Sequence, residues 1–344
     1  MIPPKIPEEK SAAVDRALRA AFGSAEIEDI QQMTGGLSSD LVFRVAVKGS
    51  PYLLRVVTKI TEQTDPARHF GYMLPAAEAG IAPRVLHASV EDGVSITDFV
   101  KAVPWSVAEA RVQVPPLLRR LHALPRFPKT FNYVTSHNFF VWKFRGMGLL
   151  PKNEVEEAFA QYERVCAVYP RIDQDMVSSH SDLKPENILF DGTRVWLVDW
   201  QAAFVNDRYF DLSVAANFVV WSEAEEQEYL AAYFGAAPNS YQRARFFLMR
   251  QVMHMLAATV YLMLGPGGKP VDVSAAAPSF REFHERVRAG GVNLADPAQR
   301  VEYGRVHWGR LLENVRSARF EEALRIVAGR DAGAVRLLPG PPAV

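Results

Sequence analysis

An aspartate, an asparagine and a second aspartate within residues 180–199 have the spacing of a magnesium and proton-transfer site. The stretch HSDLKPENILF (180–190) places Asp182 five residues before Asn187, and Asp199 follows further along. Magnesium prefers oxygen ligands and is often held by one or two protein groups together with substrate phosphates, which fits Asn187 and Asp199. Asp182 lies in the loop before Asn187, where its carboxylate could take the proton of an acceptor hydroxyl. The three residues together therefore predict phosphoryl-transfer chemistry.

The segment between Asn187 and Asp199 has the pattern of a β-hairpin. Apolar residues at 188–190 and 195–198 flank Asp191-Gly192, a strong tight-turn signal. A hairpin folded there brings its two flanking oxygen ligands together at the open end. Taken singly, each of the three polar residues also fits a cap, an Asx turn or a solvated strand end. Their joint spacing around the hairpin favours the phosphoryl-transfer interpretation.

Two features of the first hundred residues fit the phosphates of ATP. The run TGGLSS (34–39) predicts a turn whose backbone N–H groups and hydroxyls face the phosphates, although such a run is also an ordinary turn. Arg55 is the predicted phosphate-reaching cation, because its forked donors suit phosphate oxygens. Lys48 is rejected because it ends its strand at Gly49-Ser50. The predicted phosphate-binding residues are Gly35, Gly36, Ser38, Ser39 and Arg55.

The partner of Arg55 and the adenine site are predicted from the next segments. Protein kinases pair the corresponding cation with a glutamate on the following helix. Here the helix sequence DPARHFGYMLPAAEAG (65–80) has His69 at the expected position, and Glu62 and Glu78 are poor substitutes. Whether Arg55 has an ion-pair partner on this helix is therefore left open. The connector ITDFVKAVPW (96–105) predicts an adenine-binding hinge at Asp98, Phe99 and Val100.

The elements that must position these residues divide the chain into two lobes. Hydrophobic periodicity predicts an amphipathic helix at 8–22, an irregular helix at about 66–79, and five β-rich segments in the first hundred residues. Long helical patterns follow after Pro104, interrupted only by the hairpin. We predict an α+β, protein-kinase-like fold with an antiparallel sheet lobe at 1–100, a helical lobe carrying the hairpin and the acceptor site at 101–332, and a flexible tail at 333–344. The long helical patterns cover 106–123, 152–168, 208–234, 239–264 and 296–328.

Composition excludes several other classes of protein. The chain has 344 residues, 49% of them hydrophobic, and its 39 basic residues balance its 39 acidic residues. No overall field would steer it to nucleic acid or to an anionic membrane. The single cysteine, Cys166, excludes an internal disulfide framework, so a reducing cytoplasm is expected. The apolar run MLAATVYLML (255–264) is too short to span a bilayer and predicts a buried core helix.

Over about residues 30–265, the sequence resembles the choline kinase and aminoglycoside phosphotransferase superfamily. The resemblance implies that Asp182 is the catalytic base, that Asn187 and Asp199 bind magnesium, and that His180 and Asp211 support the catalytic loop. The stretch DWQAAFVNDRYFDL (199–212) looks most like choline and ethanolamine kinases. The other motifs are HSDLKPEN (180–187), VDW (198–200), GIAPRVL (80–86) and LHALP (121–125).

The expected activity is the ATP- and Mg²⁺-dependent phosphorylation of a small-molecule hydroxyl, with a choline- or ethanolamine-like amino alcohol as the first acceptor hypothesis. The tryptophans that enclose the quaternary ammonium in choline kinases have no counterpart in residues 251–264, so Trp221, Tyr261 and Trp308 are the acceptor-site candidates. An aminoglycoside or other sugar acceptor is the alternative, and a nucleotide-binding pseudokinase scaffold is the second. No nucleic-acid or membrane partner is expected, and the oligomeric state is left open.

Overall fold

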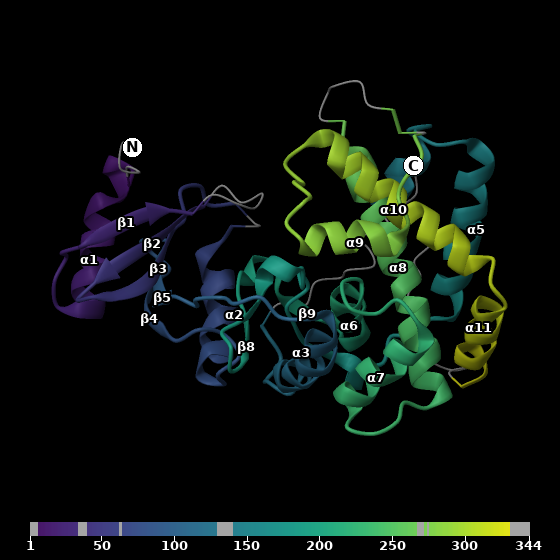
Figure 1. Ribbon diagram of the computed structural model, residues 1–344, viewed down its shortest axis with the longest axis horizontal. Helices are drawn as coiled ribbons and strands as arrows, with labels where there is room; N and C mark the ends of the chain where they lie inside the picture. The colour runs from purple at the N-terminus through teal and green to yellow at the C-terminus, as the bar shows by residue number, and fades with distance from the viewer. Residues whose placement is uncertain are drawn as a thin grey trace.

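The structure is a computed structural model that describes residues 6–33, 40–61, 64–128, 140–266, 272–273 and 275–330. It has an antiparallel sheet in its N-terminal part and a larger, mainly helical C-terminal part (Figure 1). The predicted α+β, protein-kinase-like fold is therefore confirmed. The predicted tail at 333–344 lies outside the described residues.

A five-stranded antiparallel sheet forms the N-terminal lobe. Its spatial order is β1-β2-β3-β5-β4, and α1 packs on it beside β4 and β5. Phe43, Val45, Leu54 and Ile96 are completely buried between the sheet and its neighbours, because alternate strand residues point to the same face. The elements are α1 (Glu8–Phe22), β1 (Asp29–Gln32), β2 (Leu41–Val47), β3 (Ser50–Val56), β4 (Val85–Ser89) and β5 (Val94–Asp98).

The turn between β2 and β3 consists of Lys48 and Gly49, which both have positive φ. Two such residues give the turn that matches the twist of a tight hairpin. The predicted turn at Gly49-Ser50 is thus one residue too late, because Ser50 already pairs with Val47. The Lys48 ammonium donates a hydrogen bond to the backbone oxygen of Phe22, at 2.7 Å, which fastens it to the end of α1.

Several contacts attach the sheet lobe and the segment after it to the helical lobe. Helix α2 (Pro66–Glu78) packs against a 3-10 turn, η3 (Trp200–Ala202), and the Leu197 N–H donates to the Ile81 oxygen at 2.9 Å. The extended segment after β5 is also attached, since the Val103 N–H donates to the Phe190 oxygen at 2.8 Å. The ring of Trp105 stacks on that of Phe190, with ring centroids 5.1 Å apart.

Helix α8 forms the centre of the helical lobe and contacts α5, α6, α10 and α11 (Figure 1). It is long and apolar enough to cross a bilayer, yet 67% of its most apolar window is buried inside the protein, as expected of a core helix. The helices are α3 (Val107–His122), α5 (Lys152–Val168), α6 (Arg208–Ala216), α7 (Glu223–Phe234), α8 (Ser240–Leu264), α9 (Phe280–Arg288), α10 (Pro297–Val315) and α11 (Ala318–Arg330).

The helical lobe contains four features that the sequence prediction missed. A second small sheet pairs β6 (Met176–Ser179) with β9 (Phe204–Asp207), so the hairpin is not the only β structure there. Helix α9 was absent from the prediction, and the predicted helix at 208–234 is two helices. Ser222 and Ser279 begin α7 and α9 with capping boxes to Glu225 and Glu282, a Ser-x-x-Glu signal that was available in the sequence. The predicted helix at 296–328 is likewise divided, between α10 and α11.

Candidate active site

The predicted hairpin is present. Strand β7 (Ile188–Phe190) pairs with β8 (Val195–Leu197) in antiparallel register, Ile188 opposite Leu197. Gly192 has a φ of 95°, a conformation that glycine adopts without strain. The Val198 N–H donates to the Asn187 oxygen at 3.0 Å, which closes the open end of the hairpin. Asn187 and Asp199 therefore lie at the same end.

The loop before the hairpin holds the Asp182 carboxylate between two donors. The Asn187 side-chain N–H₂ donates to Asp182 Oδ2 at 2.9 Å and to its backbone oxygen at 2.8 Å. Lys184 Nζ lies 3.1 Å from the same Oδ2. The Asp182 side chain is 37% exposed, so its other oxygen can face a substrate. This arrangement leaves one carboxylate oxygen for an incoming hydroxyl.

Asp211, on α6, binds the backbone of the same loop through its carboxylate. Its two oxygens accept hydrogen bonds from the N–H groups of His180 at 2.8 Å and Ser181 at 2.7 Å. The His122 ring lies 3.2 Å from Asp211 and 2.7 Å from the Tyr233 hydroxyl. Ser181 has a φ of 65°, which is unfavourable for a residue with a side chain. Asp211 thus fixes a strained loop immediately before Asp182.

The neighbouring histidine has one defined tautomer. His180 Nδ1 accepts the Asp182 N–H at 3.4 Å, so the proton lies on Nε2, which donates to the Val198 oxygen at 2.9 Å. His180 is completely buried and packs edge-on against Trp200. It therefore connects the catalytic loop to the residue before Asp199.

Arg55 lies between two carboxylates. Its guanidinium is 3.1 Å from Asp199 Oδ1 and 3.1 Å from Asp40 Oδ2. Asp199 itself has a φ of 66° at the end of β8, and its side chain is 28% exposed. The structure thus brings Arg55, on the sheet, to the predicted metal ligand on the hairpin.

Charge near the hairpin favours the ionised form of Asp199. Burial by itself would raise the pKa of this carboxyl, but the positive charges nearby, Arg55 foremost and Lys184 among the others, hold it below its ordinary value. Burial would lower the pKa of Lys184, yet the Asp182 charge and hydrogen bond raise it. The site is therefore a set of alternating, mutually stabilised charges.

His69, where a glutamate was sought, faces the same charges from α2. Burial lowers its pKa to about 3, and the positive charge of Arg55 contributes. The imidazole is therefore neutral and cannot serve as a counter-ion. The question that the sequence left open has a geometric answer: the carboxylates beside Arg55 come from Asp40 and Asp199.

Of the three acceptor-site candidates, Tyr261 is the one whose pKa is affected by the charge of Asp182. Burial raises its pKa to about 12, and the nearby Asp182 charge adds to this effect. Its ring contacts that of Tyr303, with centroids 4.7 Å apart. Trp308 is almost wholly buried and packs on Phe144, while Trp221 lies under the guanidinium of Arg281.

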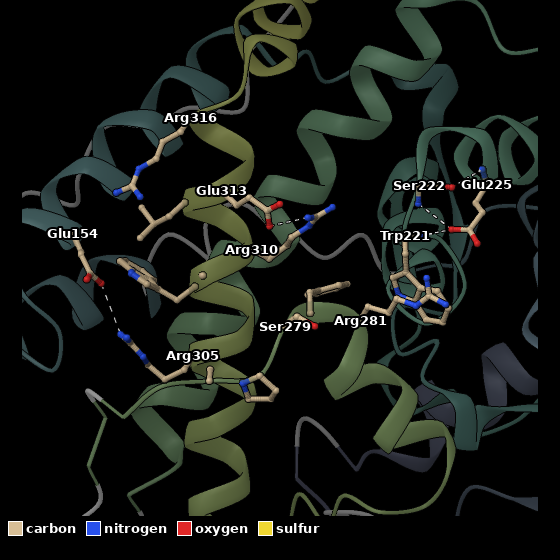
Figure 2. Close-up of a pocket in the computed structure, with 16 residues that line it drawn as sticks. Glu154, Trp221, Ser222, Glu225, Ser279, Arg281, Arg305, Arg310, Glu313 and Arg316 are labelled. Carbon is tan, nitrogen blue, oxygen red and sulfur yellow. Dashed lines mark hydrogen bonds and ion pairs between the residues drawn. The ribbon is translucent and has the colours of Figure 1, made fainter.

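Trp221 and Trp308 line a different part of the molecule, a surface cavity of about 780 Å³ between α5, α7, α9 and α10. Figure 2 shows Arg305 turned toward Glu154 and Arg310 toward Glu313, on either side of one helix. No residue of 180–199 lines this cavity. Its position gives these two tryptophans no connection to the phosphoryl-transfer residues.

The remaining predicted nucleotide residues are resolved unevenly. Gly35, Gly36, Ser38 and Ser39 lie outside the described residues. Asp98 ends β5 and forms a paired salt bridge with Arg84, with both N–O distances at 3.1 Å. The Asp98 N–H donates to the Arg84 oxygen, so it is not available to a nucleotide. Phe99 and Val100 follow β5 in extended, half-exposed backbone.

The residues present fit a magnesium ion shared with phosphates. Both N–H bonds of the Asn187 amide are directed at Asp182, which leaves its oxygen as a ligand. Asp199 provides an ionised carboxylate at the same hairpin end. Two protein oxygens suffice when phosphates and water supply the others. Among the described residues there is no cluster of three or more His, Cys, Asp or Glu side chains, so a metal site made only of such groups is not present there.

Five residues of the site were not among the sequence candidates. Lys184 and Tyr303 lack a distinctive spacing, and Gln201 follows the hairpin without a recognisable motif. Asp40 had a signal: Val42 pairs with Arg55, so a residue two positions before Val42 lies diagonally across on the same face. His122 precedes Asp211 by a long separation and was interpreted as structural.

Comparisons with known proteins give the family and the fold of this chain. A model of the phosphotransferase enzyme family matches residues 29–247. The fold resembles a choline/ethanolamine kinase family protein from Mesorhizobium loti, with a TM-score of 0.67, 21% identity, and coverage of 93% of this chain and 99% of that one. It also resembles choline kinase LicA from Streptococcus pneumoniae, with a TM-score of 0.56, 15% identity, and coverage of 83% and 98%.

A third similar structure is the macrolide 2'-phosphotransferase MphH from Brachybacterium faecium, with a TM-score of 0.55, 17% identity, and coverage of 81% and 97%. No curated protein matches the sequence. At these identities the structural matches establish the fold, whereas the family model covers more than half of the chain. Its match over residues 29–247 contains Arg55, Asp182, Asn187, Asp199 and Asp211, and on this ground the chain belongs to the phosphotransferase enzyme family.

Proposed function

We propose that this protein transfers the γ-phosphate of ATP to the hydroxyl of a small molecule, with a choline- or ethanolamine-like amino alcohol as acceptor. The observation that carries the proposal is the convergence of Asp182, Asn187 and Asp199 at one hairpin end, with Arg55 reaching them from the sheet. Each has the chemistry that phosphoryl transfer needs. LicA, which has a similar fold, has been solved with AMP bound, which supports a nucleotide site.

The proposed reaction follows from the hydrogen bonds around Asp182. Asn187 and Lys184 occupy Oδ2, so the free oxygen accepts the proton of the acceptor hydroxyl. The hydroxyl oxygen forms a bond to the γ-phosphorus while the bond from phosphorus to the β,γ-bridging oxygen breaks, releasing ADP. Lys184 and Arg55 offset the negative charge on the transferring group and its neighbours.

A bound magnesium ion would neutralise phosphate charge and orient the γ-phosphate for in-line transfer. Asn187 and Asp199 are the proposed ligands. Arg55 contacts Asp199 Oδ1, so Oδ2 of the same carboxylate would be the oxygen offered to the ion. Phe99 and Val100 remain the proposed adenine-binding backbone, whereas the Asp98 N–H is committed to Arg84.

The amino alcohol hypothesis rests on Tyr261 and Tyr303, whose pKa values are raised by burial and, to a smaller extent, by the charge of Asp182. Aromatic faces attract organic cations, and two contacting tyrosines offer such a surface near the proposed base. Likeness to choline and ethanolamine kinases points in the same direction.

An aminoglycoside acceptor is the alternative, and a pocket for such a polycationic substrate would contain acidic groups like those of the run SEAEEQE (222–228). In the structure these carboxylates are already paired: Glu225 and Glu228 with Arg111, and Glu226 with Arg319. Glu223 pairs with Arg243. A polycationic sugar would have to displace four ion pairs there, which favours the amino alcohol.

The test is acceptor-dependent ADP release with Mg-ATP and a panel of amino alcohols, sugars, macrolides and aminoglycosides. We expect turnover with a small amino alcohol and a loss of about 10²-fold or more in kcat for Asp182→Asn, because general base catalysis contributes that much. Asp173→Asn, which alters an exposed carboxylate paired with Arg126, is the control and should keep full activity.

Two results would contradict the proposal. Turnover that is unchanged in Asp182→Asn would exclude this carboxylate as the base. Nucleotide binding without turnover on any acceptor of the panel would favour the remaining alternative, a pseudokinase scaffold.

A further inference from the structure

The ion pair between Arg55 and Asp40 is one of the most buried in the described part of the chain. The Asp40 side chain has 0% exposure and that of Arg55 has 11%. Their atoms are 3.1 Å apart, at the start of β2 and the centre of β3. A buried pair of this kind is costly to break, since the remaining partner is left as an uncompensated charge.

No carboxylate of α2 can replace Asp40. The helix contains a single acidic residue, Glu78, in its last turn. His69 occupies the face of α2 near Arg55 and is only 3% exposed. Its pKa of about 3, lowered by burial and by Arg55, makes it neutral.

Gln201 connects the same carboxylate to the hairpin. Its side-chain N–H₂ donates to Asp40 Oδ2 at 2.5 Å, and its backbone oxygen accepts from Arg68 of α2 at 2.5 Å. Gln201 lies two positions after Asp199, in η3. Asp40 thus joins the start of β2, Arg55 and the segment that carries Asp199.

We propose that Asp40 is the positioning residue for Arg55, performing from the start of β2 the task that a helix glutamate performs in protein kinases. With Gln201 it also couples the start of β2 to the hairpin end that carries Asp199. The proposal rests on the proposed function, because it assumes that Arg55 contacts ATP phosphates. Asp40 holds Arg55 above the phosphates and prevents it from turning fully onto Asp199.

The loss of Asp40 should therefore impair two steps. Arg55 would retain Asp199 as its carboxylate partner and turn further onto it, so that it both leaves the phosphates and competes for a proposed magnesium ligand. Nucleotide affinity should fall more than acceptor affinity, since Asp40 is bonded to Arg55 and Gln201, whereas the proposed base Asp182 is held by Asn187 and Lys184.

The test compares Asp40→Asn with Asp29→Asn in the full chain. Asp29 forms an exposed pair with Arg44 on the same sheet, 3.3 Å apart, and is the matched control. The first readout is the Kd of a non-hydrolysable ATP analogue with Mg²⁺, measured by calorimetry. We expect a rise of about tenfold or more for Asp40→Asn and no change for Asp29→Asn. In turnover assays the KM for Mg-ATP should rise while the KM for the acceptor stays within about twofold of wild type.

A rescue variant separates positioning from folding. Asp40→Asn combined with His69→Glu returns a carboxylate to the face of α2 near Arg55, and we expect it to recover part of the nucleotide affinity. If Asp40→Asn does not fold, Gln201→Leu removes one donor to Asp40 and should shift the Kd in the same direction by a smaller factor. Nucleotide affinity equal to wild type in both Asp40→Asn and Gln201→Leu would overturn the proposal.

A readout in the protein alone distinguishes failure of this proposal from failure of the proposed function. The Arg55 Nη1–H that donates to Asp40, assigned with Arg55→Lys, should give a slowly exchanging NMR signal in wild type that is lost in Asp40→Asn, while the Nη2–H that donates to Asp199 keeps its signal. A Nη1–H signal that persists in Asp40→Asn would reject Asp40 as the positioning residue, whatever the protein binds. A wild type without acceptor turnover whose Arg55 signals depend on Asp40 would reject the proposed function and retain the positioning role.

Discussion

Strain at single residues marks the part of the chain where chemistry is proposed. Among the described residues that are not glycine, three have positive φ: Lys48, Ser181 and Asp199. Lys48 belongs to a hairpin turn, whereas Ser181 precedes the proposed base and Asp199 is the proposed metal ligand. Such conformations persist only where the surroundings enforce them. At Ser181 the enforcing group is the Asp211 carboxylate.

Asp211→Asn should therefore lower both stability and turnover. The amide offers one acceptor oxygen where the carboxylate offered two, and it directs a donor at a backbone N–H. We expect the free energy of unfolding to fall by about 3 kcal/mol, the upper range for a hydrogen bond to a charged group, and kcat to fall because Ser181 and Asp182 relax. Urea unfolding and kinetics at a temperature where the variant is folded would measure the two effects.

Tyr229→Phe is the matched control for Asp211. Its hydroxyl donates to the Leu212 oxygen at 3.0 Å, buried one residue away from Asp211, but it touches no residue of the loop. It should lose about 1 kcal/mol of stability with kcat unchanged. If Asp211→Asn kept wild-type kcat while losing stability, its role would be structural only.

At the scale of elements, the hairpin was predictable and the helix boundaries were less so. The dipeptide Asp191-Gly192 between two apolar runs determines a register in which Asn187 and Asp199 meet. By contrast, the break between α6 and α7 depends on Ser222, whose capping box interrupts an otherwise continuous helical pattern. A prediction from apolar periodicity alone does not take a capping box into account, so it joined the two helices into one. The pairing of Asp40 with Arg55 required the strand register, which the sequence specifies only indirectly.

A pair of glycine substitutions tests the contribution of turn geometry. Gly192→Ala places a side chain at a φ of 95°, and we expect a loss of about 1 kcal/mol in the free energy of unfolding, with a lower kcat because the hairpin end shifts. Gly309→Ala, in the middle of α10, has open space around its new Cβ and should gain up to about 1 kcal/mol. Urea denaturation of both variants measures the difference, and equal effects of the two substitutions would contradict this account.

At the scale of the whole molecule, buried neutral histidines make stability depend on pH. His254, His284 and His307 cluster between α8, α9 and α10, with His254 and His307 Nδ1 atoms 3.0 Å apart. Burial lowers the pKa of His284 to about 4, that of His69 to about 3, and those of His254 and His307 well below the ordinary value. All four remain neutral in the folded protein at pH values where the unfolded chain protonates them.

Stability should therefore be fully present above the unfolded histidine pKa of about 6.5 and decline as pH falls toward the folded values. Each such imidazole contributes a slope of up to about 1.4 kcal/mol per pH unit. Urea unfolding at pH 7.5, 6.0 and 5.0 would measure the decline. His307→Gln removes one imidazole, so about one proton fewer is taken up on unfolding and the free energy of unfolding should depend less steeply on pH. A free energy of unfolding that stays constant from pH 7.5 to 5.0 would refute the prediction.

The attachments between the two lobes are unevenly distributed across the sheet. Ile81 lies just before β4, at one edge of the order β1-β2-β3-β5-β4, and its bond to Leu197 fixes that edge to the hairpin. Val103 and Trp105 fix the end of the linker to Phe190 in the same hairpin. The β2 and β3 side is attached through side chains, Asp40 with Gln201 and Arg55 with Asp199, so a rotation of the sheet lobe about the anchored edge requires these bonds to open. We expect the distance between Asp40 and Gln201 to increase and decrease as the protein exchanges nucleotide. The β4 edge of the sheet would be the hinge of this motion.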